Sequence, residues 1–128
     1  MEHSNHKNDI VLYYCEYENI QSKIEHVCGP FDTYENAKNY KPKNPDKFTI
    51  PVISEDIISF SEKLEYIKTQ TQNNQRYGTV AFLCKKLENM YQEIAKKLNI
   101  DYYSFDSNGD DYIAFNDPEG EIEQEYGC

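Results

Sequence analysis

The sequence has 128 residues, a net charge of −10, and a hydrophobic fraction of 38% that includes twelve tyrosines and no tryptophan. This length suffices for one domain that buries roughly two thirds of its unfolded surface without disulfides or metals, and the aromatic content excludes a wholly disordered chain. The acidic balance argues against binding to nucleic acid or to an anionic membrane, because their phosphate groups would be repelled.

The N-terminal residues give no sign of export. Residues 1–9 lack the apolar segment of a signal peptide, and no apolar run reaches the roughly 20 residues of a membrane-spanning helix. We therefore expect a loose N-terminus over 1–9 and a cytoplasmic location, either in the cell of origin or in a host cell. One α+β domain is expected over 10–116, followed by an acidic segment, 117–128, that is either an additional strand or disordered.

Two strands and a short helix are predicted first. Ile10–Tyr17 and Lys23–Cys28 are rich in β-branched and aromatic residues and predict a hairpin. Both faces of the first strand carry apolar side chains, which indicates a central position in a sheet. Asp32 followed by Glu35 predicts the capped start of a short helix that ends before Pro42.

The next elements are a strand over 48–53 and a helix over 55–69 with Ser54 as its N-cap. A longer helix is predicted over 79–98, where apolar side chains recur at steps of three and four. Residues 100–105 and 110–115 flank Asn108–Gly109, a strong signal for a tight hairpin. The predicted order is β-β-α-β-α-α-β-β with a mixed or antiparallel sheet, which is an α+β fold in a single small domain.

The usual catalytic signatures are absent from the sequence. The five glycines form neither a phosphate-binding loop nor a dinucleotide-binding motif. His26 and Cys28 are two residues apart on one strand, about 7 Å, too far for a base to activate a nucleophile. The cysteines show no zinc-ligand spacing, so we expect no catalytic residue, no cofactor and no metal. Free thiols are expected, with a bond between Cys15 and Cys28 as the alternative that the hairpin would permit.

One segment has oxygen ligands at calcium-loop spacing. Asp106, Asn108 and Asp110 occupy positions 1, 3 and 5 of such a loop. Asp111 stands where that loop needs a glycine, and Asp117 stands where it needs a glutamate. We interpret the segment as a hairpin with solvated acids and keep a weak calcium site as the alternative.

The charge is concentrated at the C-terminus. Residues 101–128 contain nine acids and no Lys or Arg, whereas the first 100 residues contain fourteen acids and thirteen bases. Four glutamates alternate with other residues from Glu119 to Glu125, so an extended chain would align their carboxylates at a repeat of about 6.6 Å, with Ile122 and Tyr126 packing inward. A disordered tail, protection of a sheet edge and simple solubility are the alternatives.

These patterns predict a non-enzymatic domain that binds a protein with a basic surface. Its concrete form is an inhibitor of the phage anti-defence or nuclease-immunity type, which blocks a basic nucleic-acid-binding site by charge mimicry. The predicted binding residues are Asp110, Asp111, Tyr112, Asp117, Glu119, Glu121, Glu123, Glu125 and Tyr126. The protein is expected as a monomer or weak homodimer that binds neither nucleic acid directly nor membranes.

Two rival functions belong to other classes. A small enzyme would hold Mg²⁺ with Asp110, Asp111 and Asp117. A structural or assembly subunit would use the apolar stripe of 80–98 or a free sheet edge.

Overall fold

The computed structural model describes residues 8–81 and 84–125. Contacts divide the chain into two units, residues 10–58 and residues 59–128 with 1–9, and each unit is built on its own three-stranded antiparallel sheet. The α+β class and the predicted order of strands and helices are confirmed, with one further strand and one further short helix in the second unit. Within the described ranges, no helix is long and apolar enough to span a membrane.

The first unit is a sheet with the order β2-β1-β3. It contains β1 (Ile10–Glu18), β2 (Glu25–Phe31), the short α1 (Tyr34–Lys38), a 3-10 turn at Pro45–Lys47, and β3 (Val52–Ile58). The central position predicted for the first strand is confirmed. Thr33, rather than Asp32, is the N-cap of α1, because its side chain accepts the backbone N–H of Asn36 at 3.1 Å.

The boundary between the strand and the helix that follow lies later than the sequence predicts. β3 pairs with β1 over the whole of Val52–Ile58, so a helix cannot begin at residue 55. Ser59 caps α2 (Phe60–Gln70) instead, and its hydroxyl accepts the backbone N–H of Glu62 at 3.2 Å. Ser54 and Ser59 are both suitable N-cap residues. Ser59 takes this role because Ser54 lies in the strand that pairs with β1.

The second unit has the sheet order β4-β6-β5. Its elements after α2 are a 3-10 turn at Gln72–Asn74, β4 (Tyr77–Ala81), α3 (Lys85–Leu98), β5 (Tyr102–Ser107), β6 (Asp110–Phe115) and α4 (Glu121–Glu125). The hairpin around Asn108–Gly109 is confirmed. The predicted helix over 79–98 is wrong at its start, because 77–81 pairs as a strand with β6.

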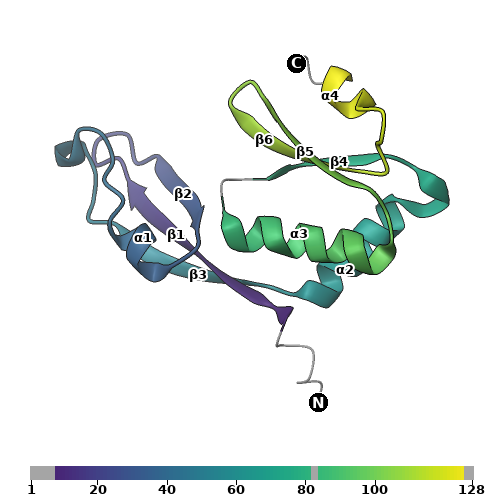
Figure 1. Ribbon diagram of the computed structural model, residues 1–128. Helices are drawn as coiled ribbons and strands as arrows, with labels where there is room; N and C mark the ends of the chain where they lie inside the picture. Colours follow the sequence, from purple (N-terminus) through teal and green to yellow (C-terminus); the bar gives the residue numbers. More distant parts are fainter. Residues whose placement is uncertain (1–7, 82–83, 126–128) are drawn as a thin grey trace. The chain divides into compact units, whose positions relative to one another are not determined.

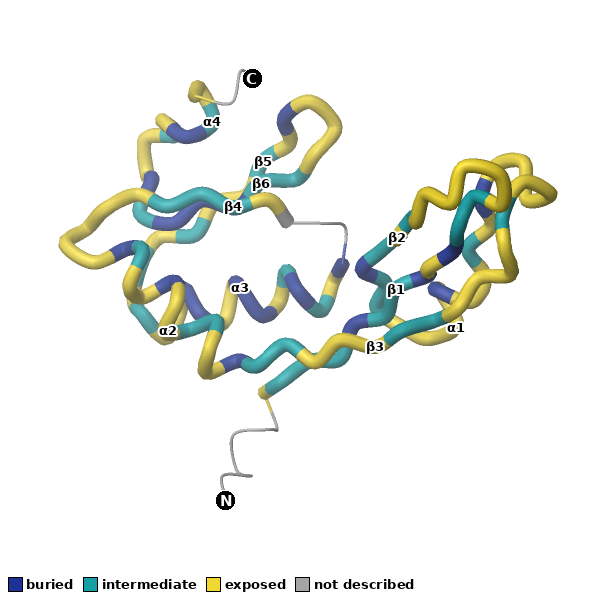
Figure 2. Tube along the Cα trace, turned by 180° about the vertical axis from the view of Figure 1, so that it is seen from behind, coloured by how far each residue is buried: buried dark blue, intermediate teal, exposed yellow. Residues whose placement is uncertain are grey.

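The apolar stripe of α3 forms the core of this unit. Leu87, Met90, Tyr91 and Ile94 are buried, and the Tyr91 ring contacts the Phe115 ring of β6 at 6.1 Å. Figure 2 shows buried positions recurring along α3 between exposed ones. In Figure 1, α3 lies along one face of the second sheet and α4 lies beside the other. The stripe is therefore filled by its own unit and is not a free seam for a partner.

Asparagine occupies most of the left-handed backbone positions in the described ranges. Besides Lys23, the non-glycine residues with positive φ are Asn44, Asn73, Asn74, Asn99, Asn108 and Asn116. Asn is the side chain best suited to this conformation after glycine. Asn99 ends α3 in this way, with φ 56° and ψ 49°.

Candidate functional site

The second sheet presents one face to α3 and leaves part of its opposite face to solvent. Along β6, Phe115 contacts the Tyr91 ring of α3, so Ile113 lies on that same side. Alternation places Asp110, Tyr112 and Ala114 on the opposite face. This opposite face is where α4 packs and where most of the predicted binding residues lie.

Helix α4 is held on the sheet by one buried side chain. Ile122 is 5% exposed. Its Cγ2 would lie 3.0 Å from a Cβ atom added to Gly78 of β4, and Gly78 pairs with the fully buried Ala114 of β6. A glycine and an alanine at these positions make the room that Ile122 fills. Docking this residue is worth about 2 kcal/mol.

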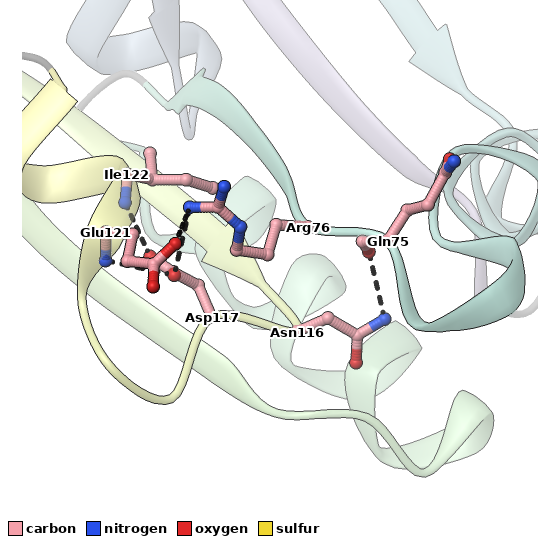
Figure 3. Close-up of polar contacts among 6 residues, drawn as sticks. All are labelled: Gln75, Arg76, Asn116, Asp117, Glu121 and Ile122. Carbon is pink, nitrogen blue, oxygen red and sulfur yellow. Dashed lines mark hydrogen bonds and ion pairs between the residues drawn. The ribbon is translucent and has the colours of Figure 1, made fainter.

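The start of α4 is fixed by the carboxylate of Asp117, which bonds to the first turn of the helix (Figure 3) and is almost wholly buried. One carboxylate oxygen accepts the backbone N–H of Glu121 at 3.0 Å, and the other accepts that of Ile122 at 2.9 Å. Helices of five residues are unstable alone, so these two bonds are what makes a helix of this segment. The Asp117 carboxylate also lies 3.7 Å from the Arg76 guanidinium.

Asn116 connects the turn before α4 to the residues that precede β4. Its backbone has φ 57°, and its side-chain amide donates to the carbonyl oxygen of Gln75 at 3.1 Å (Figure 3). The turn that leads from β6 into α4 is thus bonded to the residues that lead into β4. The position of α4 is set by the fold and not by its own helical preference.

Beyond α4, the open part of this face carries a row of apolar and aromatic side chains. Val80 of β4 lies opposite Tyr112 of β6, which lies opposite Phe105 of β5. The Phe105 ring stacks on the Tyr112 ring with centroids 5.5 Å apart and on the Tyr103 ring at 5.6 Å. Val80 and Tyr103 are 39% and 37% exposed. We call these four residues, together with Asp110 and the glutamates in and before α4, the acidic-aromatic face; the glutamates are Glu119, Glu121, Glu123 and Glu125.

The acids of α4 lie on both sides of the helix. Glu123 accepts the Tyr103 hydroxyl at 3.1 Å, and this bond is the main reason that the pKa of Tyr103 is raised. Glu121 is paired with Arg76 at 2.9 Å. A groove of ≈ 500 Å³ between α4 and β4 is lined by Arg76, Ile122, Glu125 and neighbouring residues of 74–78. The prediction of an extended chain with aligned carboxylates is therefore wrong, because Glu121–Glu125 is a helix and its acids point in several directions.

Asp111 lies on the opposite side of the sheet from the acidic-aromatic face. It pairs with Asp106 of β5. A hydrogen bond between these two carboxyl groups raises the pKa of Asp111 above its ordinary value, with smaller contributions from burial and from nearby carboxylates that include Glu88 of α3. Asp111 thus belongs to a separate acidic pair facing α3.

The predicted binding residues fall into distinct groups. Asp110 and Tyr112 lie on the open face of the second sheet, and the glutamates of α4 border this face in different directions, Glu123 toward Tyr103 and Glu121 toward Arg76. Glu119 lies in the exposed turn before α4. Asp117 is a buried helix cap, and Asp111 faces the other way. Tyr126 lies outside the described residues.

Three residues of the face were missed in the sequence. Val80 was hidden by the helix predicted over 79–98. Tyr103 and Phe105 could have been found, because a two-residue Asn108–Gly109 turn fixes Phe105 opposite Tyr112.

The described acids were searched for the geometry of a metal site. Among the residues that the structure describes, no group of three or more His, Cys, Asp or Glu side chains is placed to hold a metal ion. Asp110 and Asp111 point to opposite faces, and Asp117 is enclosed by the backbone of α4. The calcium-loop and magnesium alternatives therefore have no supporting geometry in this part of the chain.

Comparisons with models of protein families, with curated proteins and with solved structures find no match for this chain.

Proposed function

We propose that this protein is a binding domain that docks its acidic-aromatic face on a basic surface of another protein. The observation that carries the proposal is the fixed position of α4. Asp117 and Ile122 hold the helix beside the stacked rings of Phe105 and Tyr112, so the acids border an apolar platform instead of trailing from it. Anchoring aromatic groups at the centre and charged groups at the rim are the usual composition of a protein interface.

The partner proposed is a protein whose Lys- and Arg-rich surface binds nucleic acid. Residues 59–128 contain thirteen acids and seven bases, and no Lys or Arg follows residue 97. Such a charge surplus attracts a basic surface over long distances and would compete there with phosphate groups. The inhibitor expected from the sequence remains the concrete form of the proposal.

The proposal is tested with two variants that change the net charge equally. The first changes three acids of the face, Glu121→Gln, Glu123→Gln and Glu125→Gln. The matched control changes three exposed acids elsewhere, Glu35→Gln, Glu55→Gln and Glu65→Gln. Tagged protein is used to capture partners from nuclease-treated lysate of the native host, and the affinity for a captured, purified partner is then measured at low and high salt.

Binding is expected to weaken about tenfold or more in the first variant, to change little in the control, and to fall steeply with salt. Capture that is equally unaffected in both variants would refute a role for this face. Equal losses in both variants would show that only net charge matters, and would also contradict the proposal.

A second candidate function, assembly through the first sheet, has an observation of its own. Val27, Ile50, Val52 and Ile57 are 60%, 88%, 63% and 63% exposed. Both edge strands of that sheet, β2 and β3, carry such residues, and exposed apolar edges favour pairing with another chain. A monomer by light scattering at every concentration tested would refute this function, whereas a dimer that Val52→Lys abolishes would support it.

A further inference from the structure

Two cysteines lie directly opposite each other in the first sheet. Cys15 of β1 and Cys28 of β2 are partners in the antiparallel ladder, and both are free. Opposed residues of an antiparallel pair have Cα atoms about 4.5–5.5 Å apart. This separation falls within the roughly 4.4–6.8 Å between the Cα atoms of bonded cysteines, so the backbone permits a disulfide here.

The two sulfurs differ in their access to solvent. Cys15 is 0% exposed, whereas Cys28 is half-buried. The Tyr17 hydroxyl lies 3.6 Å from the Cys28 sulfur. Burial, and then the nearness of Cys28, raises the pKa of the Cys15 thiol. An oxidant from solvent therefore meets Cys28 first, and Cys15 is the thiol placed to react next.

We propose that Cys15 and Cys28 form an oxidisable dithiol, which a small-molecule disulfide converts into an intramolecular disulfide. With a small-molecule disulfide, the Cys28 thiolate attacks one sulfur of the reagent, forms a mixed disulfide and releases one thiolate. The Cys15 thiolate then attacks the Cys28 sulfur, and the second thiolate of the reagent leaves. Two protons and two electrons pass from the pair to the reagent, which is reduced to two thiols.

The bond would be readily reversed. Opposed side chains of a ladder have Cβ atoms about 4.5–5.5 Å apart, whereas relaxed disulfides have about 3.5–4.5 Å. Closing this difference strains the bond, and strained disulfides are the more easily reduced ones. The site is thus suited to cycling between dithiol and disulfide and is independent of the acidic-aromatic face.

The test treats the folded full-length chain with oxidised glutathione, blocks remaining thiols with an alkylating reagent, and digests the product with trypsin. Lys23 lies between the two cysteines, so cleavage at Lys7, Lys23 and Lys38 places Cys15 in peptide 8–23 and Cys28 in peptide 24–38. The expected main product is these two peptides joined by a bond that dithiothreitol removes. Cys84, buried at the start of α3, and Cys128 fall in other peptides and serve as internal controls.

Two variants separate the steps. Cys15→Ala is expected to accumulate glutathione on Cys28, because the second thiol is missing, and Cys28→Ser is expected to leave Cys15 unmodified. A native protein that keeps glutathione on Cys28 while Cys15 remains a thiol would overturn the proposal. So would cross-links formed equally with Cys84 or Cys128, and so would a folded chain that does not react although the unfolded chain does.

Discussion

Replacing Asp117 with alanine tests the account of how α4 is held. The side chain is 2% exposed and accepts two backbone N–H groups of α4. Hydrogen bonds to a charged group contribute about 1.5–3 kcal/mol each, so leaving both donors unpaired would cost more than α4 gains by docking. That gain is the burial of Ile122, about 2 kcal/mol, and the exposed Arg76–Glu121 pair, at most about 1 kcal/mol.

The docking free energy of α4 is the smaller of these two quantities, and it limits the loss of stability. The reason is that the helix can detach from the sheet and expose its N–H groups to water instead of staying docked with unpaired donors. We therefore expect Asp117→Ala to lower the free energy of unfolding by about 2–3 kcal/mol, and α4 to unfold locally. Asp117→Asn keeps one acceptor and is expected to lose about half as much. The measurements are urea denaturation and amide hydrogen exchange at Glu121 and Ile122.

Asp101→Ala, at an exposed position, is the control and should stay within about 0.5 kcal/mol of the native protein. A loss below that value for Asp117→Ala, or amide protection of Ile122 that survives the change, would refute the role given to this carboxylate.

Three further outcomes follow from the second unit. Gly78→Ala brings a Cβ atom to 3.0 Å from Ile122, so we expect a loss of about 1–3 kcal/mol with faster exchange of the Ile122 amide; unchanged stability would contradict the tight packing. Burial, and then a hydrogen bond in which the Tyr77 hydroxyl donates to Tyr66, raises the pKa of Tyr77 to about 12. The stability that the neutral Tyr77 hydroxyl contributes is therefore complete below pH ~10 and is lost as the pH rises toward 12. Ultraviolet titration should show the Tyr77 hydroxyl ionising near pH 12, and Tyr77→Phe should remove this ionisation. The pKa of Asp111 is raised by its hydrogen bond to Asp106, so stability falls as the pH rises through that pKa. We expect this loss to be less than about 1 kcal/mol between pH ~4 and pH ~7. Asp111→Asn should reduce it, as measured by denaturation at the two pH values.

Local signals in the sequence predict the elements that need only local chemistry. The Asn108–Gly109 turn defines its own register, and the apolar stripe of α3 defines its buried face, so both were predictable. The strand at 77–81 was not, because Thr79 and Val80 also fit the periodic pattern of the helix that follows them. Only pairing with β6 distinguishes the two.

The geometry of the acidic segment depends on one long-range observation. Repulsion between glutamates and the nearby Pro118 and Gly120 argue against a helix at 121–125. The sequence does not reveal that Asp117 is buried with both oxygens directed at the first turn, or that Arg76, more than 40 residues earlier in the chain, lies beside it. The chemical identity of the acids was therefore predictable, and their directions were not.

The left-handed asparagines limit how this sequence can change. At Asn44 or Asn99, a β-branched or bulky residue would cost roughly 1–2 kcal/mol of backbone strain, whereas glycine would relieve strain but give the unfolded chain more freedom to lose. These two effects of glycine are similar in size and opposite in sign. Such positions should tolerate a small set of residues, so a mutational scan would show them as more sensitive than other exposed positions, although less sensitive than the core.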